Sequence, residues 1–168
     1  MSVFRRLAAP LLLLLPLLAV AEPRTYTGVV THVSDGDTVW VRPARGGPPV
    51  QLRLLGVDAP EICQRFGRQA REALERQVLH RRVTVEERGR DGYDRVLARL
   101  RRSGQDVNGW LVAQGLAWSH RYRHQPGPYQ ALQEQARAAR RGLWAADRPL
   151  EPRDFRRLHG PCTPPTQS

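Results

Sequence analysis

Three carboxylates stand where turns or strand ends could bring them together. Asp37 lies in a turn signal at residues 34–37, and Asp58 and Glu61 follow a strand-like segment further along the chain. Carboxylate oxygens from different loops form sites for hard cations, and calcium accepts them together with main-chain carbonyls and waters. No cysteine belongs to the group, which argues against a soft-metal site. These residues alone leave open the alternative that they only shape turns.

The elements that must position these carboxylates follow from the apolar pattern. Alternation of apolar and polar residues predicts five strands, at residues 26–33, 38–42, 50–55, 82–87 and 95–101. Apolar residues at helical spacing predict about three helices, at residues 67–79, 107–114 and 128–141. The first helix is inserted after the third strand, and along that strand Leu52 and Leu54 face the core while Arg53 faces the opposite side.

One contiguous run strengthens the case for a site. Residues 53–61 read RLLGVDAPE, with DGDT at residues 35–38 upstream and YDR at residues 93–95 downstream. With these motifs the chain resembles the staphylococcal nuclease, or thermonuclease, family over about residues 25–144. The resemblance implies an α+β, mainly β fold, in which five strands form an OB-fold barrel accompanied by about three helices.

The resemblance also implies a role for each matching residue. Asp37 and Asp58 would bind Ca²⁺, and the main-chain carbonyl of Ala59 would add a ligand. Glu61 would orient the attacking water or accept its proton. Carboxylate and cation together would then form the hydrolytic half of an active site.

Two arginines would complete that site by holding the non-bridging oxygens of the phosphate. Attack on a phosphodiester adds negative charge, and the planar forks of Arg53 and Arg95 suit its stabilisation. The guanidinium pKa makes arginine a poor general acid, so we assign both residues to charge stabilisation. Asp94 replaces a glycine that is common in the family at this position, and its carboxylate could pair with Arg95 and weaken its pull.

Substrate contacts are expected from two further segments. Tyr93 resembles a family residue that contacts the terminal phosphate. In the loop at residues 119–124 the family uses tyrosines to stack on the base, but here Arg121 stands at such a position and Tyr122 is out of phase. We expect a basic, partly aromatic binding lip formed by these residues. His120 and His124, four residues apart, are an alternative zinc pair, although no glutamate follows His120.

The charge of the chain indicates a polyanionic partner. All 27 basic residues are arginines, and against 16 acidic residues they give a formal net charge of +11. Such a surplus exceeds what a small acidic substrate needs and suits a nucleic acid or an anionic membrane.

The N-terminal segment of the chain indicates export. Arg5 and Arg6 precede an apolar run at residues 11–20, and small residues at 19 and 21 suit a cleavage site. The run is too short to span a bilayer. We therefore expect a signal peptide at residues 1–21, a nuclease domain at 22–148 and an irregular tail at 149–168. In an oxidising compartment the two cysteines, Cys63 and Cys162, are expected to form a disulfide.

Together these observations predict an exported, periplasmic or secreted nuclease that depends on Ca²⁺ and hydrolyses DNA and RNA with little sequence preference. By resemblance, it would leave 3′-phosphates. We expect a monomer with no stable protein partner and no membrane span after removal of the signal. Two alternatives remain: a non-catalytic OB-fold protein that binds nucleic acid, and a cationic protein that binds envelope polyanions.

Overall fold

The computed structural model describes residues 24–120, 125–160 and 162. Five strands dominate it: β1 (Thr25–Val33), β2 (Thr38–Pro43), β3 (Val50–Leu54), β5 (Arg82–Arg90) and β6 (Val96–Arg102). Three two-residue strands accompany them: β4 (Val57–Asp58), β7 (Gln105–Asp106) and β8 (Trp118–Ser119). The helices are α1 (Gly67–Val78), α2 (Val107–Ala113), α3 (Gln130–Ala138) and α4 (Pro152–His159), with a 3₁₀ turn, η1 (Gly142–Ala145).

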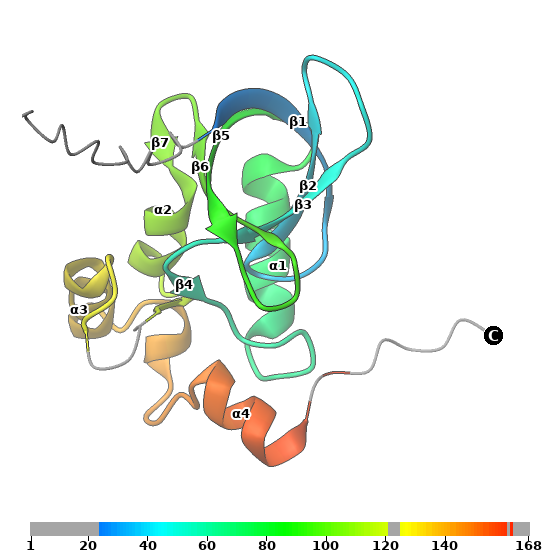
Figure 1. Cartoon of the computed structure of the whole chain (residues 1–168). Helices are drawn as coiled ribbons and strands as arrows, with labels where there is room; N and C mark the ends of the chain where they lie inside the picture. The colour runs from blue at the N-terminus through cyan, green and yellow to red at the C-terminus, as the bar shows by residue number, and fades with distance from the viewer. Residues whose placement is uncertain (1–23, 121–124, 161, 163–168) are drawn as a thin grey trace, which may run out of the picture.

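The long strands close into a barrel (Figure 1). Their order is β3-β2-β1-β5-β6, with antiparallel neighbours, and β3 pairs in parallel with β6 to complete the ring. Most inward positions are valine or leucine side chains, including the fully buried Val30, Val39, Leu52, Val85 and Leu100. Alternation along each strand therefore places the apolar set in one core, as the sequence pattern predicted.

Helices cover the ends of this barrel. α1 packs its buried face, formed by Ala70, Leu74 and Val78, onto the main core. A smaller apolar cluster lies beside α3 and joins Trp118, Ala136, Leu143 and Trp144. Within the described residues, no helix is both long and apolar enough to cross a membrane.

The predicted fold class, an α+β barrel of five strands with helices, is confirmed. α3 ends at Ala138, three residues before the predicted end, because Arg140 takes a left-handed conformation (φ 50°) and breaks the helical path. The predicted signal peptide at residues 1–21 lies outside the described residues.

The tail at residues 149–168, which we expected to be irregular, contains α4. That expectation is wrong for residues 152–159, because the proline that suggested irregular structure stands in the first turn of the helix, where its missing N–H is not needed. Gly160, with φ 73°, follows the helix. A disulfide between Cys63 and Cys162 joins the end of this tail to the loop before α1, so the predicted cross-link is present in the structure.

Asn108 ties α2 to the barrel end where β3 finishes. Its side chain is fully buried; the amide nitrogen donates to the carbonyls of Leu55 (2.9 Å) and Ala98 (3.1 Å), and the amide oxygen accepts from the N–H of Leu100 (3.1 Å). Because one buried side chain bonds three backbone groups, we expect Asn108→Ala to lower the free energy of unfolding by about 2–4 kcal/mol.

Urea unfolding monitored by circular dichroism measures this loss. The control is Gln114→Ala, an exposed residue at the end of the same helix. A free energy for Asn108→Ala within about 0.5 kcal/mol of that control would contradict the prediction.

Candidate active site

The guanidinium of Arg53 is the centre of the site. It leaves β3 on the side away from the core, and its Nη1 lies 2.8 Å from Asp37 Oδ2 while its Nη2 lies 2.9 Å from Asp58 Oδ1. Nη1 also donates to the carbonyl of Val57 at 3.0 Å. Only 15% of this side chain is exposed, so the guanidinium is held in one orientation by fixed acceptors.

A turn before β2 positions Asp37. The carboxylate of Asp35 accepts the N–H of Asp37 at 2.9 Å, which shows that Asp35 shapes this turn. The carbonyl of Asp37 accepts the N–H of Leu54 at 2.8 Å, and its Oδ2 accepts the N–H of Ala59 at 2.7 Å. The register of β2 with β3, which places Thr38 opposite Arg53, then puts the two charges side by side.

A second turn brings Asp58 back to Arg53. Gly56, with φ 79°, makes this turn, and a Cβ at this position would lie 2.5 Å from Pro128 Cγ, so both conformation and space favour glycine. β4 then pairs with β8, with Asp58 opposite Trp118. The first part of the nine-residue motif is therefore the end of a strand, followed by a glycine turn that brings the Asp58 carboxylate back to Arg53.

Burial raises the pKa of the Asp37 carboxyl well above its ordinary value, and the charges of Asp35 and Asp58 raise it further, although Arg53 opposes them. Two buried carboxylates thus share one guanidinium, and a further cation would relieve their repulsion. Their hard oxygen donors fit calcium. Within the described residues, no three or more His, Cys, Asp or Glu side chains are grouped to hold a metal ion, so a cation at this place would depend on two carboxylates, main-chain oxygens and water.

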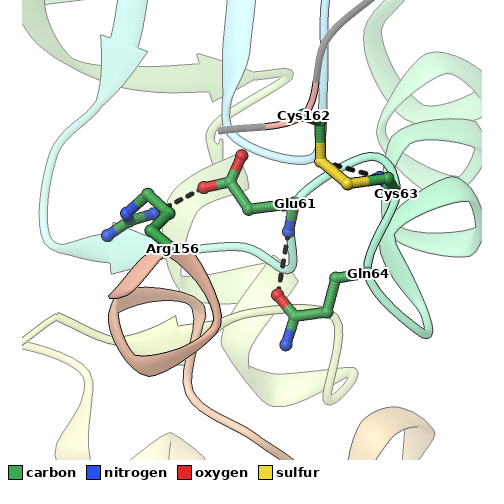
Figure 2. Close-up of a disulfide and its surroundings, with 5 residues drawn as sticks. All are labelled: Glu61, Cys63, Gln64, Arg156 and Cys162. Atoms are coloured by element: carbon green, nitrogen blue, oxygen red, sulfur yellow. Dashed lines mark hydrogen bonds and ion pairs between the residues drawn. A yellow bond between two sulfur atoms is a disulfide. The ribbon is translucent and has the colours of Figure 1, made fainter. Parts of the chain in front are cut away.

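Glu61 lies in the loop after β4 and meets an arginine that the sequence analysis missed (Figure 2). Arg156 Nη1 lies 2.6 Å from Glu61 Oε1, and Nη2 of the same guanidinium lies 3.3 Å from Asp58 Oδ2. Burial opposes the charge of Arg156, but the bonds with Glu61 and Asp58 outweigh it and raise the pKa of Arg156. One signal for this contact is present in the sequence, the expected disulfide, because a bond between Cys162 and Cys63 brings the tail back to the loop that carries Glu61.

Tyr93 and Arg95 lie in the turn just before β6. The partner of Arg95 is Asp91, whose Oδ2 lies 2.8 Å from Nε, and not Asp94, which pairs with Arg90 at 3.2 Å. Asp94 has φ 61°, a conformation that explains why glycine suits this position. Tyr93 is 84% exposed, and the Arg95 guanidinium carbon lies 5.4 Å from its ring centroid.

These residues surround one cavity of about 670 Å³. Its lining contains six of the predicted site residues: Asp37, Arg53, Ala59, Glu61, Tyr93 and Arg95. Asp58 is bound to two arginines of the same wall. Two predicted lip residues, Arg121 and Tyr122, lie outside the described residues, as does His124 of the alternative zinc pair.

Comparisons with known proteins agree with this geometry. Residues 51–146 match the family model described as "Staphylococcal nuclease homologue". An "Uncharacterized endonuclease" of Haemophilus influenzae is 37% identical over 152 residues, covering 90% of this chain and 84% of the relative. "Protein ParB" of Escherichia coli is 36% identical, covering 85% and 87%, and the "Micrococcal nuclease" of Shigella flexneri is 33% identical, covering 94% of each chain.

The barrel, the cavity and the similarity to these proteins together define the class of protein. The chain belongs to the staphylococcal nuclease family. It is an endonuclease, a hydrolase of phosphodiester bonds, and its substrates are nucleic acids.

The raised pKa of Asp37 leads to a prediction about stability. A carboxyl whose pKa is higher in the folded than in the unfolded chain favours folding at low pH, and that contribution is lost as pH rises through the folded pKa. We expect Asp37→Asn, measured in chelator, to unfold at a higher temperature than the wild type at neutral pH. The difference should shrink as pH falls toward the ordinary pKa of aspartate.

Thermal unfolding at a series of pH values tests this. Glu72→Gln, an exposed carboxylate on α1, is the matched control and should show no such trend. An Asp37→Asn variant that unfolds below the wild type at neutral pH would show that the ion pair with Arg53 outweighs the burial cost.

Proposed function

We propose that the protein is an exported, calcium-dependent nuclease that cleaves DNA and RNA with little sequence preference and leaves 3′-phosphate ends. The observation that carries this proposal is the convergence of Asp37 and Asp58 on Arg53, at a cavity that Glu61 and Arg95 also line. This arrangement joins hard-cation ligands, a candidate base and two guanidinium groups around one space that a phosphodiester can enter.

Asp37, Asp58 and the main-chain carbonyl of Ala59 would hold the calcium ion. When bound, it would supply Lewis-acid polarisation of the phosphate. The N–H of Ala59 donates to Asp37 Oδ2, and the N–H of Leu54 donates to the Asp37 carbonyl, so the Asp37 carboxylate is oriented before any ligand arrives. Preorganised oxygens of this kind lower the cost of binding.

Glu61 is our candidate for the group that orients the attacking water and accepts its proton. Its loop is held by a hydrogen bond from the Glu61 N–H to Gln64 Oε1 at 3.1 Å, which places the carboxylate at the cavity wall (Figure 2). A carboxylate within reach of a bound water contributes by general base catalysis, typically about 10²–10⁴-fold in rate.

Arg53 and Arg95 would stabilise the charge that develops on the phosphate oxygens. Both guanidinium groups are held by carboxylates, Arg53 by Asp37 and Asp58 and Arg95 by Asp91, so they need little reorganisation during the reaction. The exposed Tyr93 in the cavity lining could donate its hydroxyl to a terminal phosphate. Arg121 and Tyr122 remain predicted contacts to the base.

Low sequence preference follows from the kind of contacts available. Arginine and hard-cation contacts to phosphate carry no base information, and DNA and RNA share that phosphate. The proposed export rests on the signal-like residues 1–21 and is supported by the disulfide, which suits an oxidising compartment. We further propose that the mature protein acts as a monomer.

Cleavage of plasmid DNA by the mature chain tests the catalytic proposal. We expect cleavage with calcium and none with chelator, and Glu61→Gln and Arg53→Ala should each lower the rate at least about a hundredfold. Glu72→Gln and Arg76→Ala are the matched controls, because both side chains are exposed on α1. Plasmid binding without cleavage in the wild type would instead support the non-catalytic OB-fold alternative.

The chemistry of the product ends forms a separate prediction. If the 3′-phosphate is left on the upstream fragment, a DNA polymerase should extend that fragment only after phosphatase treatment. Extension without phosphatase would mean that the bond on the other side of the phosphorus is broken. Single-stranded DNA and RNA of the same sequence, digested in parallel, measure the preference between the two substrates.

A further inference from the structure

We propose that Arg156 is a third phosphate-binding arginine of the active site, supplied by α4 and kept in place by the Cys63–Cys162 disulfide. The inference rests on the proposed function, because it adds a residue to that same site. Arg156 lies beyond residues 51–146, the part of the chain that matches the family model. Nothing in the nine-residue motif or its flanking motifs indicates it.

Contacts place Arg156 within the site itself. Its guanidinium reaches Glu61 Oε1 at 2.6 Å and both oxygens of Asp58 at 3.3 and 3.4 Å, and it lines the same cavity as Arg53 and Arg95. Three arginines therefore converge on one space, from β3, from the residue just before β6 and from α4.

The three guanidinium groups differ in their freedom to take a new partner. Arg53 is 15% exposed and shared between Asp37 and Asp58, and Arg95 is 29% exposed and tied to Asp91. The side chain of Arg156 is 40% exposed, and its guanidinium is at the end of a long flexible chain. A phosphodiester that enters the cavity offers it anionic oxygens of the same kind as the carboxylate oxygens that it contacts in the free protein.

α4 itself is held by few contacts. Pro152 is its only buried residue, and Leu158 is 63% exposed. Upstream of the helix, Gln64 Nε2 donates to the carbonyl of Leu150 at 2.7 Å. An eight-residue helix with so little buried surface depends on tertiary restraints for its position.

The disulfide supplies such a restraint on the other side of the helix. Cys162 follows α4 by three residues and is bonded to Cys63, which lies two residues after Glu61 (Figure 2). Figure 1 shows α4 beside the loop that follows β4. The cross-link therefore fastens the helix that carries Arg156 to the loop that carries Glu61, and loss of the bond should release Arg156 from the site.

Equilibrium binding of a fluorescent single-stranded DNA in chelator tests the phosphate contact without cleavage. We expect Arg156→Ala to weaken binding about tenfold and to reduce the slope of log K against log salt by about 0.7, the value for one phosphate contact on a single strand. Arg156→Lys keeps the charge and should keep the slope. Arg157→Ala is the matched control, because that residue of the same helix is 76% exposed and pairs with Asp154, and it should stay within about twofold of the wild type.

The role of the disulfide is tested by combining variants. With calcium, Arg156→Ala should raise KM about tenfold and change kcat less than about threefold, because the lost contact is to bound substrate. The double variant Cys63→Ser/Cys162→Ser should raise KM similarly. Adding Arg156→Ala to it should cause little further change, since the two alterations remove the same contact.

Several outcomes would overturn the inference. Unchanged affinity and salt slope for Arg156→Ala would exclude a phosphate contact, and faster cleavage would show that Arg156 restrains Glu61. Thermal unfolding of each variant separates these effects from loss of the fold; if Arg156→Ala fails to fold, a wild-type KM and affinity in the serine double variant would still refute the proposal. A wild type that binds DNA but does not cleave it with calcium would defeat the proposed function, while the binding comparison would still be decisive for Arg156.

Discussion

The guanidinium of Arg53 between Asp37 and Asp58 is the interaction on which the site depends. It brings together the turn before β2, the strand β3 and the glycine turn that leads to β4. Both carboxylates are buried, and Arg53 supplies the positive charge that pairs with them there. The parallel pairing of β3 with β6, which closes the barrel, sets the same strand beside the one that follows Arg95. The constraint that closes the fold thus also assembles the site.

The buried carboxylates around Arg53 lower the stability of the fold but provide the charged groups of the site. Burial raises the pKa of Asp37, and the charges of Asp35 and Asp58 raise it further, so keeping this carboxylate ionised costs stability and depends on Arg53. Most of the 27 arginines supply a diffuse field that attracts a polyanion. In the proposed function, the arginines that carboxylates hold at the cavity have a different task, because only a group held in place can favour one arrangement of charge over another.

The sequence predicted the barrel because each strand carries the alternation that a half-buried strand needs, and it predicted the outward direction of Arg53 for the same reason. It failed for the tail, where proline and arginine suggested irregular structure but a proline in the first helical turn starts α4. It also left open whether Asp94 pairs with Arg95. In the structure, Asp91 accepts the N–H groups of Tyr93 and Arg95 as well as the side chain of Arg95, and so shapes the turn that presents this arginine.

The sequence by itself determined the family, through its motifs, and the types of group available for chemistry. It also determined the turns around Asp37 and Asp58, because these follow from interactions among residues near one another in the chain. Only the tertiary structure decided that Arg156 meets Glu61, 95 residues away. That contact depends on the path of the whole chain around the barrel, which brings α4 back beside the loop after β4, and no local pattern of residue types encodes this path.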